Sequence, residues 1–180
     1  MSSAQREYPE TKAGPFPRPP EDFTDREDRT IEITLASEVP VERIVDMYAD
    51  FDPAQRAQGI PPSDPERIEP WIKTVIEEGV HIAASHDSRV VGHAMLVPDG
   101  DDAYELAIFV HQEYQQAGIG RSLIEHLLGA GLSAGVERIW LTVERWNVPA
   151  IELYRSVGFE TVLADRFDIE MAMKLTETSS

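Results

Sequence analysis

Two glycines, Gly118 and Gly120, stand where an apolar run gives way to a helical pattern. The apolar run ends at Val110, and leucine and isoleucine then recur at helical spacing over residues 119–128. The first amides of a helix have no partner within it, and the helix dipole adds partial positive charge there. Glycine has no Cβ, so an anion can approach the backbone closely. We therefore expect this junction to bind a cofactor that carries a pyrophosphate.

Two common phosphate-binding loops do not fit this stretch. A P-loop requires a Gly-Lys pair, and the chain contains none. A dinucleotide fingerprint requires Gly-x-Gly-x-x-Gly, but the third glycine position is occupied by Leu123. A nucleotide-binding module is therefore disfavoured.

The stretch from Gln115 to Gly120 resembles the acetyl-coenzyme A loop of the GNAT acetyltransferase family, Gln/Arg-x-x-Gly-x-Gly/Ala. A second stretch resembles the family signature Asn-x-x-Ala-x-x-Leu-Tyr-x-x-x-Gly-Phe and runs from Asn147 to Phe159. Its local chemistry is consistent with a helix, because asparagine is a good N-cap and Gly158 suits a left-handed helix end. The resemblance covers approximately residues 30–175.

The elements around these motifs predict a single α/β (α+β) domain. The predicted order is β-α-α-β-β-β-α-β-α-β-β, which is similar to a GNAT-like mixed, mostly antiparallel central sheet with helices on both faces. In that family the fourth and fifth strands separate, and here these would be residues 104–110 and 138–143. We expect residues 1–29 to be a flexible, proline-rich N-terminal tail, 30–175 the acetyltransferase domain and 176–180 a polar C-terminal tail.

The resemblance also implies roles for individual residues. Backbone groups of one strand would hold the thioester carbonyl and the pantetheine arm: Ile108, Phe109 and Val110. Amides of the loop would bind the pyrophosphate: Gln116, Ala117, Gly118, Ile119, Gly120 and Arg121. Asn147 would hydrogen-bond the cofactor arm, and Tyr154 would lie near the sulfur as general acid.

Glu105 is the candidate general base. An amine must lose a proton before it attacks, because a free lysine has a pKa of about 10.4. Period two places Glu105 on the same strand face as Phe109, and a half-buried carboxylate can have a raised pKa. Ribosomal-protein N-terminal acetyltransferases carry glutamate where this chain has Thr142, which argues against N-terminal acetylation. Glu144 is a weaker alternative base.

These residues predict an acetyl-CoA-dependent N-acetyltransferase that transfers acetyl directly to a primary amine in a ternary complex. The chain has no cysteine to carry the acetyl group. The acceptor is a protein lysine or a small-molecule amine, and the loops expected to select it are 50–65 and 164–168. The alternative is a non-catalytic acyl-CoA-binding sensor. We expect no metal, because the histidines lack metal-ligand spacing, and we interpret Trp140 as a packing residue.

The composition limits location and partners. No apolar run reaches the ~20 residues that span a bilayer, and the N-terminus lacks a signal-peptide core, so we expect a cytoplasmic protein. With 33 acidic and 16 basic residues, the net charge is −17, which disfavours binding to nucleic acid or anionic membranes. The sequence leaves open whether the protein is a monomer or a homodimer.

The acidity has two interpretations. One is halophilic adaptation to an acidic proteome in a high-salt cytoplasm, where salt screens the self-repulsion; the other is a site that attracts cationic substrates. The dispersed acids and the near absence of lysine favour the first interpretation.

Halophilic adaptation predicts that the fold is lost as salt is removed, because unscreened carboxylates repel one another. The melting temperature should therefore rise by several degrees or more between low and molar potassium chloride, measured by circular dichroism. A melting temperature that does not change over this range would contradict the interpretation.

Overall fold

The computed structural model describes residues 6–52, 54 and 61–177. These residues form an eight-stranded sheet in the order β1-β2-β3-β4-β5-β6-β8-β7. Its strand pairs are antiparallel except for β5 and β6, which run parallel. The strands are β1 (Glu21–Thr24), β2 (Thr30–Leu35), β3 (Val80–His86), β4 (Arg89–Pro98), β5 (Tyr104–Val110), β6 (Arg138–Glu144), β7 (Glu160–Ala164) and β8 (Asp168–Lys174).

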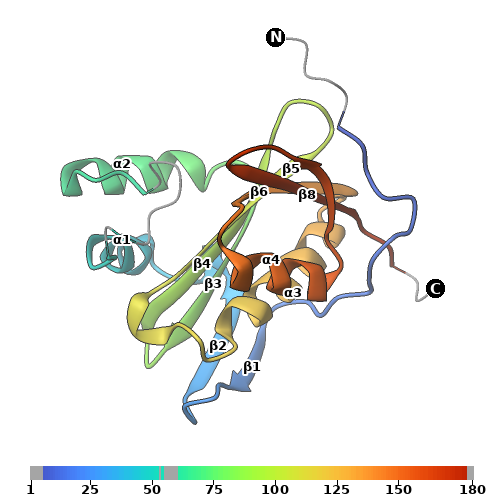
Figure 1. The fold of residues 1–180 in the computed structure, drawn as a ribbon. Coiled ribbons are helices and arrows are strands. Elements are labelled where there is room, and N and C mark those ends of the chain that lie inside the picture. The colour runs from blue at the N-terminus through green and yellow to red at the C-terminus, as the bar shows by residue number, and fades with distance from the viewer. Residues whose placement is uncertain (1–5, 53, 55–60, 178–180) are drawn as a thin grey trace.

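Helices cover both faces of this sheet (Figure 1). The helices are α1 (Val41–Ala49), α2 (Pro65–Val75), α3 (Ile119–Ser133) and α4 (Val148–Val157), with short 3₁₀ segments η1 (Ala36–Glu38) and η3 (Gln112–Tyr114). Helices α1 and α2 pack on one face, and α3 and α4 on the other. Successive side chains of β3 point to opposite faces of the sheet and so contribute to both cores. Ile82 and Ala84 face α3, while Ala83 faces α1. The predicted fold class is confirmed, and the predicted element order holds from β2 to β8.

The N-terminal segment differs from the prediction of a flexible tail over residues 1–29. Its described part packs on the domain: β1 pairs with β2, and the Ala13 amide donates to the Lys174 carbonyl at 2.8 Å. The Thr176 amide donates back to the Ala13 carbonyl at 3.0 Å. The proline and charge content of this segment is typical of a flexible tail, but the hydrogen-bond partners of Ala13 lie near the C-terminus of the chain. Residues 1–5 and 178–180 of the two predicted tails lie outside the described residues.

A buried chain of polar groups joins α1 to β3 and β4. The Tyr48 hydroxyl lies 2.6 Å from His93 Nδ1, His93 Nε2 lies 3.0 Å from His81 Nδ1, and His81 Nε2 lies 2.8 Å from the Glu78 carbonyl. Because a carbonyl can only accept, His81 donates to Glu78, His93 donates to His81, and Tyr48 donates to His93. Burial, with His81 nearby, lowers the pKa of His93 to about 3, so the chain stays neutral. The Tyr48 ring then packs edge-on against Phe109 at a centroid distance of 5.6 Å.

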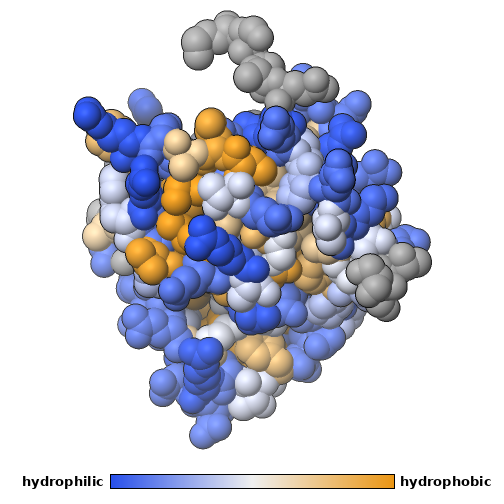
Figure 2. All heavy atoms as spheres, turned by 45° about the vertical axis from the view of Figure 1, so that its right-hand side comes forward, coloured by the Kyte–Doolittle hydropathy of each residue, from blue (hydrophilic) through white to orange (hydrophobic). Residues whose placement is uncertain are grey.

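Hydrophilic residues cover most of the surface seen in Figure 2, with smaller hydrophobic areas between them. No helix among the described residues combines the length and apolar character needed to cross a bilayer.

The N-terminal segment crosses α3 at Gly129. A Cβ placed there would lie 1.9 Å from the Pro17 carbonyl oxygen and 3.0 Å from that of Phe16. Such distances are far inside van der Waals contact, so any larger residue must displace the segment. Glycine at this position therefore permits the close approach of backbone to helix.

Gly129→Ala should destabilise the protein by about 1–3 kcal/mol, because the crossing segment must move. The direction of the stability change tests the crossing, because the same substitution in an unobstructed helix would stabilise the protein by about 1 kcal/mol. Urea unfolding measures the change. Gly131→Ala is the control, because its Cβ would meet the Leu96 side chain rather than backbone. A higher stability for Gly129→Ala would contradict the crossing.

Candidate functional site

A cleft opens where β5 and β6 separate. The two strands share two register pairs, Tyr104 with Ile139 and Glu105 with Trp140, and diverge beyond them. The resulting cleft has a volume of about 400 Å³. Its walls come from β5, β6, α4 and the start of α3, and the following predicted site residues line it: Glu105, Ile108, Phe109, Val110, Gly120, Asn147 and Tyr154. The structure thus brings together residues that the two sequence motifs place far apart.

The glycine loop lies at the end of this cleft. Gly118 is the N-cap of α3 with φ of 92° and ψ of 0°, a left-handed conformation that favours glycine. No side chain caps the α3 N-terminus, so the first amides of the helix point out of the loop. A Cβ on Gly120 would lie 3.7 Å from Leu153 and 3.9 Å from Ile108, on the cleft wall. Gly120 therefore leaves room at the wall for a ligand.

Of the predicted loop residues, only Gly120 belongs to the cleft lining. The others are Gln116, Ala117, Gly118, Ile119 and Arg121, and three of them, Ala117, Gly118 and Arg121, line a hollow on the outer side of the loop instead. The Arg121 guanidinium donates to Glu125 Oε1 and to Ser156 Oγ, both at 2.9 Å. This side chain therefore ties α3 to α4.

The turn between β1 and β2 supports the glycine loop. The Arg26 amide donates to the Ala117 carbonyl at 3.1 Å, and a Cβ on Gly118 would lie 4.0 Å from Arg26 Nε. Asp25 holds the turn: its side chain, 0% exposed, accepts from the Arg29 amide and guanidinium at 2.9 and 2.8 Å. No sequence pattern pointed to Arg26, because it belongs to the segment predicted as a tail.

Tyr154 lies on the cleft-facing side of α4. Its ring packs edge-on against Phe159 at a centroid distance of 5.9 Å. Burial raises the pKa of the Tyr154 hydroxyl to about 12. The hydroxyl is therefore neutral near pH 7 and able to donate a proton.

Glu105 also lines the cleft, half-buried at the start of β5. Burial is the main cause that raises the pKa of its carboxyl. The charge of Arg6 opposes the shift, while Asp99 and Glu170 add to it. A raised pKa suits a carboxylate that takes up a proton, because it strengthens the base.

Asn147 is the N-cap of α4, and its side-chain oxygen accepts from the Ala150 amide at 3.3 Å. The N-cap expected from the sequence is confirmed. Thr142 and Glu144 also line the cleft, so both positions face the same space as Tyr154.

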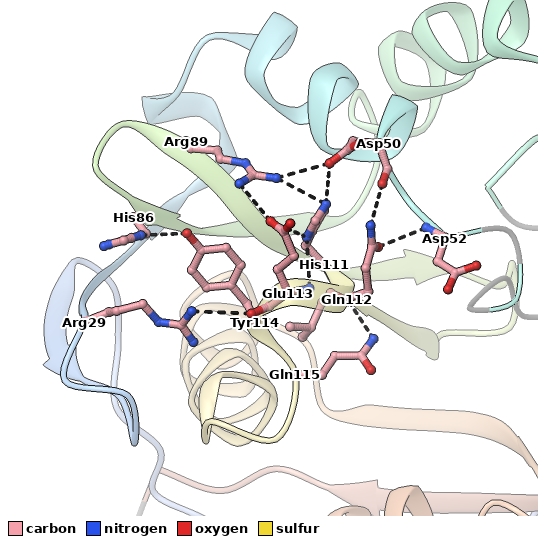
Figure 3. Close-up of polar contacts among 11 residues, drawn as sticks. Arg29, Asp50, Asp52, His86, Arg89, His111, Gln112, Glu113, Tyr114 and Gln115 are labelled. Carbon is pink, nitrogen blue, oxygen red and sulfur yellow. Dashed lines mark hydrogen bonds and ion pairs between the residues drawn. The ribbon is translucent and has the colours of Figure 1, made fainter.

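A polar network joins η3 to the start of the 50–65 loop (Figure 3). His111 is fully buried, and its Nδ1 accepts from the Glu113 amide at 3.2 Å. Its Nε2 therefore carries the proton and donates to Asp50 Oδ2 at 2.8 Å. Gln112 donates to the Asp50 carbonyl at 2.8 Å and accepts from the Asp52 amide at 3.0 Å. The network thus fixes the first residues of this loop next to the glycine loop, and much of the remaining loop, residues 53 and 55–60, lies outside the described residues.

In the described part of the chain, no group of three or more histidine, cysteine, aspartate or glutamate side chains is arranged to hold a metal ion.

Comparisons with known proteins agree with this geometry. The family model for the Acetyltransferase (GNAT) family matches residues 42–159. The chain is 31% identical over 114 residues to the [ribosomal protein bS18]-alanine N-acetyltransferase of Escherichia coli K12, which covers 63% of this chain and 74% of the relative. It is 32% identical over 80 residues to an uncharacterised N-acetyltransferase of Mycobacterium bovis, covering 44% of this chain and 51% of that protein.

Solved structures share the fold. The crystal structure of the E. coli ribosomal-protein-S18-alanine N-acetyltransferase superposes with a TM-score of 0.62 at 25% identity, covering 83% of this chain and 96% of that one. A Salmonella typhimurium acetyltransferase, solved with acetyl-CoA, superposes with a TM-score of 0.64 at 18% identity, covering 83% and 96%. The family model spans both motifs and the cleft between them, and the chain belongs to the GNAT acetyltransferase family.

Proposed function

We propose that the protein transfers an acetyl group from acetyl-CoA to an amine by direct attack in a ternary complex. The observation that carries this proposal is the cleft between β5 and β6, which joins an uncapped α3 N-terminus to Tyr154 and Glu105. Solved relatives with acetyl-CoA and with coenzyme A support the choice of cosubstrate.

The cosubstrate would bind along β5 with its pyrophosphate at α3. The amides that begin α3 would donate to the phosphate oxygens, and the helix dipole favours their negative charge. Beyond the two register pairs, β5 has no ladder with β6, so the backbone of Ile108–Val110 can pair with the amides of the pantetheine arm. Arg26 lies beside Gly118 and would add a positive charge near the phosphates.

The chemistry then divides between two side chains. Glu105, directly or through water, takes the proton that the attacking amine loses. The amine nitrogen forms a bond to the acetyl carbon, and the carbon–sulfur bond breaks. Tyr154 donates its proton to the departing sulfur, which leaves as the free thiol of coenzyme A. The neutral state of Tyr154 at pH 7 supports this role.

The acceptor is a primary amine of a protein or of a small molecule. The E. coli relative is named for the alanine of a ribosomal protein. The resemblance implies a glutamate in such N-terminal acetyltransferases at the position where Thr142 lines this cleft, which argues against an N-terminal acceptor. We further propose a cytoplasmic enzyme, monomeric or homodimeric, that binds neither nucleic acid nor membranes.

Release of free thiol tests the proposal directly. The protein is incubated with acetyl-CoA and a panel of amines and peptides in high salt, and the thiol is measured with a chromogenic disulfide. Amine-dependent thiol release is expected. Tight binding of acetyl-CoA without release for any amine would favour the acyl-CoA sensor instead.

Tyr154→Phe should lower kcat about 10²-fold while the Kd for acetyl-CoA changes less than about twofold. Phenylalanine keeps the ring packing on Phe159 and removes the proton donor alone. Steady-state kinetics and calorimetry measure the two quantities. Tyr104→Phe on β5 is the matched control and should keep full activity. Full kcat in Tyr154→Phe would refute the assignment.

Glu105→Gln should lower kcat/KM about 10²-fold and remove the acid limb of the pH profile. In the parent enzyme this limb should have its midpoint above 4.5, the ordinary value for glutamate, because burial raises the pKa of Glu105. Activity is therefore lost as the pH falls through that midpoint and the carboxylate is protonated. If Glu105→Gln kept the acid limb of the pH profile, another residue would be the general base, and Glu144 would be tested next.

A further inference from the structure

A guanidinium from the N-terminal segment lies on the sheet face beside the cleft. Arg6 Cζ is 3.6 Å from the centroid of the Trp140 ring, within cation–π range. Arg6 Nε and Nη2 donate to Glu170 Oε1 at 3.0 and 2.6 Å, and Nη1 lies 3.9 Å from Asp99 Oδ2. Asp99, Trp140 and Glu170 therefore surround one positive charge, and together they are called the cation subsite.

Contacts other than Arg6 also hold the cation subsite in place. Asp99 Oδ1 accepts from the amides of Asp101 and Ala103 at 2.8 and 3.3 Å, and its Oδ2 accepts from Trp140 Nε1 at 2.8 Å. The Asp99 side chain is 14% exposed. Burial alone would raise the pKa of Asp99, but these hydrogen bonds lower it, so the carboxylate is charged. The indole ring and one carboxylate are thus oriented for a cation before one binds.

The cation subsite adjoins the cleft through the strand register. Trp140 is the partner of Glu105 across β5 and β6, and Glu170 is the partner of Thr142 across β6 and β8. Glu105 and Thr142 both line the cleft. Neighbouring strands lie about 4.8 Å apart, so a cation over Trp140 is one strand spacing from the candidate base.

The link between Arg6 and the rest of the fold is short, and its half-buried Tyr8 ring has Arg138 Cζ 5.8 Å from its centroid. Backbone hydrogen bonds of the described chain begin at Ala13, so residues 7–12 connect Arg6 to the sheet without a ladder of their own. A ligand tied by a short linker acts at an effective concentration on the order of millimolar. A free cation of comparable affinity can therefore compete with Arg6 at millimolar concentration.

We propose that the cation subsite recognises a second positive charge on the acceptor, and that Arg6 occupies it as an internal competitor until the acceptor displaces it. The acceptor class is then an amine that carries a further ammonium or guanidinium group, in a small molecule or in a peptide. The proposal rests on the proposed function for the identity of the reacting amine. Binding in the subsite itself requires no acetyl transfer.

Calorimetric binding of agmatine, which joins a primary amine to a guanidinium, tests the proposal in the full-length protein with coenzyme A present. Arg6→Ala should bind agmatine about fivefold or more tightly than the parent protein, because the competitor is gone. Arg18→Ala, an exposed arginine of the same segment, changes the charge equally and should match the parent. Pentylamine, which lacks the guanidinium, should show no gain. The dipeptide Ala-Arg amide, run in parallel, separates a peptide acceptor from a small one.

A second substitution tests whether the gain in agmatine affinity arises in the cation subsite itself. Adding Glu170→Gln to Arg6→Ala should abolish the gain for agmatine and for the dipeptide while coenzyme A binding is kept. Equal affinity of parent and Arg6→Ala for both cations, with unchanged coenzyme A binding, would make Arg6 a structural contact and overturn the proposal. Failure of the proposed function is a separate result, because it would appear as absent thiol release whatever the agmatine affinities are.

Discussion

Strands β5 and β6 share the register pairs Tyr104 with Ile139 and Glu105 with Trp140 before they separate. A parallel pair that ended in this way inside a sheet would leave backbone donors and acceptors unmatched unless something else met them. The surrounding elements maintain the opening: β4 pairs with β5 over seven residues, and β8 pairs with β6 over seven. Each wall of the cleft is therefore rigid on its outer side and open toward the other wall.

The N-terminal segment contributes at both ends of this opening. Near the glycine loop, the Arg26 amide holds the Ala117 carbonyl. Beside the cleft, Arg6 lies over Trp140. Between these points the segment crosses α3 at Gly129 and joins the C-terminal end of β8 through Ala13. A stretch whose composition resembles a disordered tail is thus placed along the half of the molecule that carries both motifs.

The sequence predicted what depends on local patterns. Gly118 and Asn147 each begin a helix through chemistry carried by that residue itself, and period two placed Glu105 and Phe109 on one strand face. The features that escaped prediction depend on contacts distant in sequence. Arg6 reaches Glu170, and Trp140, interpreted as a packing residue, holds Arg6 on its ring. No local pattern distinguishes a tryptophan that fills a core from one that presents its face to a cation.

The position of Ala13 has a consequence for the order in which the molecule assembles. Its partners are Lys174, the last residue of β8, and Thr176, which lies two residues further along the chain. Strand β1 can pair with β2 early, since the two are neighbours in sequence, but the residues before it must wait for the completed β8. Arg6 likewise donates to Glu170 on β8, so the segment before β1 gains its partners only once the last strand of the chain is in place.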